Sequence, residues 1–153
     1  MEIERKYLVD SLPENLAGYP HVEIEQGYLC TSPTLRVRRM GDFFILTVKE
    51  KVRSESTAAV NREEEFALTA DKYAMLLAKC DGHTVGKTRY RIPLENGLTA
   101  ELDLFHGRHE GLRVVEVEFP SVEAADAFEP PAWFGEDVSA DPRYRNSYLA
   151  SIQ

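Results

Sequence analysis

Charged side chains of one sign recur at every second position in several segments of the sequence. The acidic pairs are Glu2/Glu4, Glu63/Glu65, Glu101/Asp103 and Glu116/Glu118, and the basic pairs are Arg36/Arg38 and Lys87/Arg89. A surface selected only for solubility would mix the two signs, because neighbouring like charges repel one another. Carboxylates are typical ligands of hard divalent cations, and Lys and Arg are typical ligands of phosphate oxygens. The pattern therefore indicates that the protein binds a polyanion and divalent metal ions at the same site and acts on the polyanion there.

Positions two apart lie on the same face of a β-strand, about 6.6 Å from one another. The alternation of apolar and polar residues predicts strands at 2–9, 22–30, 35–40, 43–49, 62–68, 87–93, 98–105 and 113–119, and helices at 70–79, 122–128 and 141–150. The faces opposite the charges are apolar and need to be buried. For any single strand, an ordinary solvated charged face is the simpler interpretation. The repetition of like-charged pairs favours a shared interior instead.

About eight strands can curl into a closed sheet whose interior holds side chains or one small ligand. If the charged faces line that interior, it needs water and ions, since unpaired buried charge is costly. The predicted fold class is α+β and predominantly antiparallel β: an eight-stranded, closed or nearly closed tunnel with a few peripheral helices.

The totals bound the remaining choices. A chain of 153 residues that is 43 % hydrophobic suits one domain, expected over residues 1–153. The net charge of -8, from 18 Lys+Arg against 26 Asp+Glu, argues against nucleic acid or an anionic membrane as the partner. The N-terminal residues include no apolar leader, and no segment approaches the ~20 apolar residues of a membrane span. We therefore expect a cytoplasmic protein, as a monomer or homodimer.

Nine short motifs in a fixed order resemble one known family. They are Glu2-Ile3-Glu4-Arg5-Lys6, Gln26-Gly27-Tyr28-Leu29, Leu35-Arg36-Val37-Arg38, Thr47-Val48-Lys49, Glu63-Glu64-Glu65, Lys87-Thr88-Arg89-Tyr90, Glu101-Leu102-Asp103, Val115-Glu116-Val117-Glu118-Phe119 and Asp141-Pro142-Arg143-Tyr144-Arg145-Asn146. Each motif alone occurs on ordinary strands. Together, from Glu2 to about Asn146, the chain resembles the compact bacterial members of the CYTH-type triphosphate tunnel metalloenzymes.

The resemblance implies an antiparallel eight-stranded tunnel, a small triphosphate substrate, and dependence on Mg²⁺ or Mn²⁺. Phosphate would be bound by Lys6, Arg36, Arg38, Lys49, Lys87 and Arg89. Metal ligands, direct or through water, would come from Glu2, Glu4, Glu63, Glu65, Glu101, Asp103, Glu116 and Glu118. Which of these carboxylates touch the metal directly stays open.

Phosphoryl transfer depends mainly on positioning and charge neutralisation. Lys6 is a hypothetical general base or water-orienting group, because a lysine among other cations loses its proton more readily. A phosphate-binding ammonium is an equal alternative for Lys6. Tyr28 would partner Lys6 from the second strand, or would be an ordinary strand aromatic.

The predicted function is metal-dependent hydrolysis of a triphosphate. Inorganic tripolyphosphate is the leading candidate, because the sequence shows no clear adenine-binding device. The alternatives are a thiamine or nucleoside triphosphatase, adenylate cyclase-type cyclisation of ATP, and a non-catalytic polyphosphate binder. A pure anion binder gains nothing from eight carboxylates beside its ligand, which favours an enzyme.

Overall fold

The computed structural model describes residues 1–151. Its strands are β1 (Glu2–Val9), β2 (His21–Thr31), β3 (Thr34–Met40), β4 (Phe43–Lys51), β5 (Ala59–Leu68), β6 (Asp81–Pro93), β7 (Thr99–Phe105), β8 (Arg113–Glu118) and β9 (Phe134–Asp137). Its α-helices are α1 (Ala70–Leu77), α2 (Val122–Asp126) and α3 (Asn146–Ser151), and four 3-10 turns cover Leu16–Gly18, Glu95–Gly97, Gly107–His109 and Pro142–Tyr144. All strand pairings are antiparallel.

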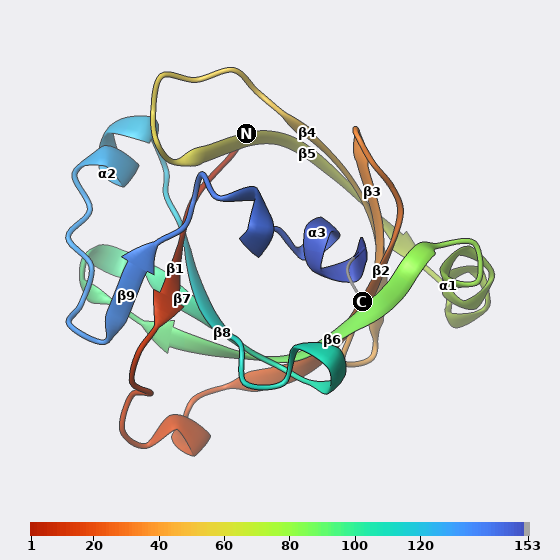
Figure 1. Ribbon diagram of the computed structural model, residues 1–153, viewed down its shortest axis with the longest axis horizontal. Helices are drawn as coiled ribbons and strands as arrows, with labels where there is room; N and C mark the ends of the chain where they lie inside the picture. The colour runs from red at the N-terminus through yellow and green to blue at the C-terminus, as the bar shows by residue number, and fades with distance from the viewer. Residues whose placement is uncertain (152–153) are drawn as a thin grey trace.

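The sheet closes on itself to form a barrel, seen end-on in Figure 1. The strand order is β5-β4-β3-β2-β6-β7-β8-β1, and pairing of β1 with β5 completes the ring. One edge of β1 is shared, because β5 pairs with its first residues and β9 pairs with its last. The expected eight-stranded tunnel is confirmed, and β9 lies outside the ring as a ninth strand.

The main apolar core lies on the outer side of the barrel wall. Tyr7, Leu102 and Val115 point away from the tunnel and are buried. Phe128, which follows α2, and Phe134, the first residue of β9, pack against Tyr7 with tilted rings whose centroids lie 6.1 and 5.0 Å away. Alternation along each strand therefore buries apolar residues outside and turns the charged residues into the lumen.

The helix α1 is capped by Thr69, whose hydroxyl accepts a hydrogen bond from the Lys72 amide. It packs beside β2 and β3, where its buried Tyr73 donates a hydrogen bond of 2.9 Å to Glu25. The expected helix at 70–79 is thus present and ends at Leu77. No helix within residues 1–151 is long and apolar enough to cross a membrane.

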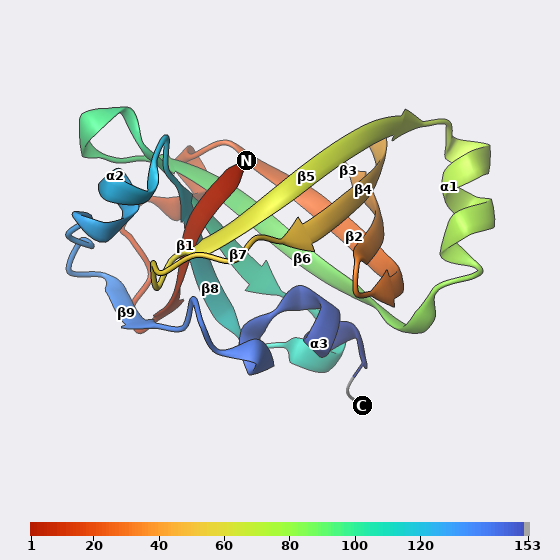
Figure 2. The same ribbon diagram turned by 90° about the horizontal axis from the view of Figure 1, so that it is seen from above.

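The C-terminal segment differs from the single helix expected over residues 141–150. It forms the 3-10 turn Pro142–Tyr144 and then α3, because Arg145 between them has an extended backbone with φ -72° and ψ 137°. The α3 helix lies within the outline of the ring in Figure 1 and at one end of it in Figure 2. Its Leu149 and Ala150 pack on Tyr28 and Phe105. This helix therefore covers one end of the tunnel.

Candidate active site in the tunnel

The barrel encloses a cavity of about 850 Å³, lined by residues from all eight strands of the ring and from the C-terminal segment. All of the sequence-predicted site residues line it except Lys87 and Asp103. Those that line it are Glu2, Glu4, Lys6, Tyr28, Arg36, Arg38, Lys49, Glu63, Glu65, Arg89, Glu101, Glu116 and Glu118. Side chains separated by more than 100 positions in the sequence thus share one enclosed space.

Three carboxylates converge at one place on the wall. Glu2 and Glu4 of β1 and Glu118 of β8 each bring one oxygen to within 4.8 Å of the others. The antiparallel register explains this, because Glu4 and Glu118 lie directly opposite each other. Burial raises the pKa of Glu4 well above its ordinary value, and the neighbouring Glu116 raises it further. Burial also raises the pKa of Glu2 and of Glu118. The cluster carries more negative charge than the protein itself neutralises.

Lys49 is the cation nearest to this cluster. Its Nζ atom lies 2.7 Å from a carboxylate oxygen of Glu2 and 3.8 Å from oxygens of both Glu4 and Glu63. Burial on its own would lower the pKa of Lys49, but the carboxylates of Glu4 and Glu2 raise it above its ordinary value. Lys49 therefore stays an ammonium in the tunnel.

Arg36 and Arg38 of β3 form a cationic part of the lining. Both are buried, and neither forms an ion pair with a carboxylate of the described chain. Arg36 donates to the Thr47 hydroxyl at 3.3 Å, and its Nε is the one buried side-chain nitrogen or oxygen in residues 1–151 without a hydrogen-bond partner. Burial lowers the pKa of Arg38 to about 9, and the charge of Arg36 adds to this. Two unneutralised guanidinium groups side by side are suited to an anion.

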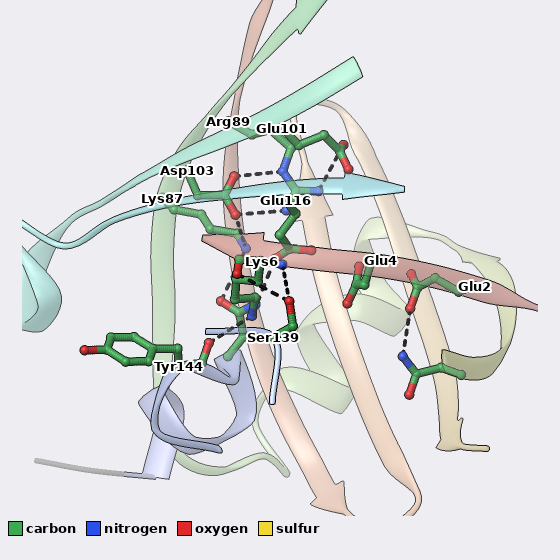
Figure 3. Close-up of polar contacts among 12 residues, drawn as sticks. Glu2, Glu4, Lys6, Lys87, Arg89, Glu101, Asp103, Glu116, Ser139 and Tyr144 are labelled. Carbon is green, nitrogen blue, oxygen red and sulfur yellow. Dashed lines mark hydrogen bonds and ion pairs between the residues drawn. The ribbon is translucent and has the colours of Figure 1, made fainter. Parts of the chain in front are cut away.

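A second charged network is already satisfied within the protein (Figure 3). Arg89 donates two hydrogen bonds, of 2.8 and 2.9 Å, to the carboxylate of Asp103. The same carboxylate lies 2.8 Å from Nζ of Lys87, and Arg89 also contacts Glu101 at 3.4 Å. Burial lowers the pKa of Lys87 to about 7 although Asp103 acts in the opposite direction. Lys87 and Asp103 are fully buried and are not among the residues that line the cavity.

Lys6 lies between the wall and the C-terminal segment. Its Nζ is 3.6 Å from Glu116 and donates a hydrogen bond of 2.9 Å to the carbonyl oxygen of Tyr144 (Figure 3). Although burial acts in the opposite direction, Lys6 and then Arg89 hold the pKa of Glu116 well below its ordinary value. Glu116 thus neutralises cations, whereas Glu4, on the neighbouring strand, faces other carboxylates.

Sequence reasoning missed Gln26 as a site residue; it is an uncharged side chain that connects two residues of the cavity lining, Tyr28 and Arg38. Its side chain is fully buried, accepts from Arg38 Nε at 2.9 Å and donates to the hydroxyl of Tyr28 at 2.7 Å. Thr47 was also missed; it accepts from Arg36 and donates to Glu65 at 3.4 Å. Two signals in the sequence could have found them: each begins one of the family-like motifs, and each lies two positions from a predicted site residue on the same strand.

The chain matches the CYTH domain over residues 1–144. A protein of Nitrosomonas europaea named inorganic triphosphatase is 43 % identical over 155 residues, which cover 97 % of this chain and 96 % of that protein. An inorganic triphosphatase of Acetivibrio thermocellus is 35 % identical, covering 97 % of this chain and 92 % of that protein. Among solved structures, the inorganic triphosphatase NE1496 is similar with a TM-score of 0.72 and 40 % identity, covering 100 % of this chain and 96 % of that one.

Proposed function

This chain belongs to the CYTH domain family, and we propose that it is a divalent-metal-dependent triphosphatase that hydrolyses inorganic tripolyphosphate inside its tunnel. Two relatives that align over nearly their whole length, at 43 % and 35 % identity, are named inorganic triphosphatases. The observation that carries the proposal is that one cavity contains both cations and carboxylates that the protein itself does not neutralise. Arg36 and Arg38 have no carboxylate partner there, while Glu2, Glu4 and Glu118 have too few cations.

Phosphate binding is assigned to the lumenal cations. They are Lys6, Arg36, Arg38, Lys49 and Arg89, with Lys87 supporting Arg89 through the Asp103 carboxylate that they share. The guanidinium groups can each offer two parallel N–H donors to phosphate oxygens. An anion at Arg36 and Arg38 would give the orphan Nε of Arg36 its acceptor and would relieve the repulsion between the two side chains.

The metal is assigned to Glu2, Glu4 and Glu118. Carboxylate oxygens are the ligands that Mg²⁺ and Mn²⁺ prefer. The raised pKa values of these three groups show that their ionised forms are destabilised, and a bound cation would stabilise those forms. A bound divalent ion supplies neutralisation of phosphate charge and polarisation of phosphate oxygens. Most of the other predicted carboxylates orient cations: Glu63 contacts Lys49, Glu101 and Asp103 contact Arg89, and Glu116 contacts Lys6. Glu65 instead accepts a hydrogen bond from Thr47.

Lys6 and Tyr28 are the proposed catalytic side chains. Lys6 Nζ donates a hydrogen bond to the carbonyl oxygen of Tyr144 and forms an ion pair with Glu116, so its role is to orient phosphate or water as a donor. The Tyr28 hydroxyl already accepts a hydrogen bond from Gln26 and keeps its own proton for a group in the cavity that it lines. Positioning and charge neutralisation then account for most of the rate enhancement.

One panel of assays tests the proposal. Tripolyphosphate, thiamine triphosphate and ATP are each incubated with Mg²⁺, Mn²⁺ or a chelator, and phosphate, pyrophosphate and cyclic nucleotide are measured. We expect phosphate and pyrophosphate from tripolyphosphate with either metal and no product with the chelator. Faster hydrolysis of an organic triphosphate would contradict the proposed substrate. Release of cyclic nucleotide from ATP would contradict the proposed reaction. Binding without metal-dependent turnover would identify a non-catalytic binder.

A further inference from the structure

The C-terminal segment contacts the charged groups of the barrel at two points. The carbonyl oxygen of Tyr144 accepts a hydrogen bond of 2.9 Å from Lys6 Nζ, and the side-chain oxygen of Asn146 accepts one of 3.4 Å from Lys87 Nζ. The two lysines come from β1 and β6. The residue between these two contacts is Arg145, whose backbone is therefore held at the end of the tunnel.

The backbone of Arg145 is fixed while its charged group is uncommitted. Its amide donates to the carbonyl of Pro142 at 3.3 Å, and its own carbonyl accepts from the amide of Leu149 at 3.0 Å. Leu149 is buried in the cluster that closes this end of the barrel. Arg145 lines the cavity and is exposed to solvent, and its guanidinium makes no hydrogen bond or ion pair with any side chain in the described part of the protein.

Arg143, two residues earlier, shows the contrasting arrangement. Its guanidinium lies 2.6 Å from a carboxylate oxygen of Asp141, and Arg143 does not line the cavity. The two arginines share the same short segment and the same charge. They differ in that one is neutralised by its own chain and the other faces the cavity unpaired.

We propose that Arg145 is a further substrate-binding residue, which contacts a phosphate at one end of tripolyphosphate where the C-terminal segment borders the tunnel. The inference rests on the proposed function and extends it. A guanidinium fork matches two phosphate oxygens, and a side chain that reaches in from a fixed backbone loses less entropy on binding than one on a mobile loop. The strand pairs of like charge give no hint of this residue, because it lies outside the sheet.

The test compares Arg145→Ala, Arg145→Lys and the matched control Arg143→Ala. In steady-state hydrolysis of tripolyphosphate with Mg²⁺, Arg145→Ala is expected to raise KM about tenfold with kcat within about twofold of wild type, the size of one charge-assisted hydrogen bond. Arg145→Lys keeps the charge and lies between the two. Arg143→Ala keeps the wild-type KM. Titration calorimetry with tripolyphosphate in the presence of a chelator measures affinity without turnover, and the four proteins should rank in the same order as in KM.

A role in folding alone would not change the salt dependence of binding. Removing a phosphate contact makes KM of Arg145→Ala less sensitive to ionic strength than KM of the wild type. Arg145→Gln is a second neutral variant of similar length, so a folding defect of Arg145→Ala leaves the question answerable. The inference is overturned if the wild type hydrolyses tripolyphosphate and the neutral variants at position 145 match Arg143→Ala in KM and affinity. If the wild type itself neither binds nor hydrolyses tripolyphosphate, the proposed function fails first.

Discussion

Gln26 donates a hydrogen bond of 2.7 Å to the hydroxyl of Tyr28, two residues along the same strand. The other end of the Gln26 amide accepts from Arg38, which fixes the orientation of the amide because its oxygen must face the guanidinium. The hydroxyl proton of Tyr28 is consequently free to serve the cavity. An uncharged residue thereby sets the direction in which a proposed catalytic group donates.

Gln26→Leu is expected to destabilise the protein and to reduce turnover. Leucine has a similar volume but leaves the Arg38 Nε and the Tyr28 hydroxyl without their present partners, at a cost of about 1–3 kcal/mol in the free energy of unfolding. We expect kcat for tripolyphosphate to fall about tenfold. Urea unfolding and steady-state kinetics measure the two effects, with Tyr73→Phe on the outer wall as the control. Unchanged kcat in a stably folded Gln26→Leu would contradict the assigned orientation.

Arg36→Gln is expected to separate stability from binding. Arg36 is buried with an unpartnered Nε, so its charge destabilises the fold of the ligand-free protein. A glutamine at this position can still form a hydrogen bond with Thr47. The free energy of unfolding should stay equal or rise by about 1 kcal/mol. KM for tripolyphosphate should rise at least about tenfold. Chemical unfolding and kinetics test both, and Arg62→Gln on the exposed face of β5 is the control. A large loss of stability without a change in KM would refute the anion-binding role.

The metal prediction concerns Glu4→Gln. Removing one of three converging carboxylates relieves repulsion between them. In the presence of a chelator at neutral pH, the variant should therefore unfold at a higher temperature than the wild type. Adding Mg²⁺ or Mn²⁺ at about 100 Kd should stabilise the wild type by about 2.7 kcal/mol, roughly 5–10 °C, and should leave Glu4→Gln nearly unchanged. Glu64→Gln, an exposed neighbour outside the cavity lining, is the control. An equal metal-induced shift in Glu4→Gln would place the metal elsewhere.

The like-charged pairs were sufficient to predict the tunnel and most of its lining. Period-two alternation fixes the face on which a side chain lies, and Glu4, Arg38 and Glu116 all face the cavity as expected. It does not fix the depth of a residue along the tunnel. Lys87 and Arg89 share a face, but only Arg89 lines the cavity, because Lys87 lies nearer the end that α3 covers.

Other features depend on tertiary contacts that the sequence pattern does not encode. The four residues of β9 follow Pro130 and Pro131 and pair only with the end of β1, so no run of alternating residues announces this strand. The apolar Leu149 and Ala150 indicate that one side of α3 is buried, but they do not indicate which part of the barrel it packs against. Arg145 contributes to the cavity only because that helix closes the barrel from the end.

Two histidines, His83 and His109, lie next to each other beside α3. His109 Nε2 lies 2.8 Å from the carbonyl oxygen of Leu149 and 3.3 Å from Nε2 of His83. The carbonyl can only accept, so the proton belongs to His109 and the facing nitrogen of His83 is bare. Protonating His83 as well would set two N–H groups against each other. Burial lowers the pKa of His83, and the charges of Arg108 and His109 act in the same direction.

Mild acid should therefore loosen the contact between α3 and the barrel. Because the folded state lowers the pKa of His83, its contribution to stability is present above the ordinary histidine pKa of about 6.5 and is lost as pH falls through the folded-state value. Between pH 7.5 and pH 5.5, the melting temperature of His83→Gln should fall less than that of the wild type, by roughly 2 °C. His21→Gln, on an exposed residue of β2, should behave as the wild type. Limited proteolysis across the same pH range locates the change, since α3 should become cleavable in the wild type before it does in His83→Gln. Identical pH profiles for all three proteins would show that the pair carries no proton-dependent contact, and the hydrogen bond from His109 to Leu149 would then persist irrespective of the charge on His83.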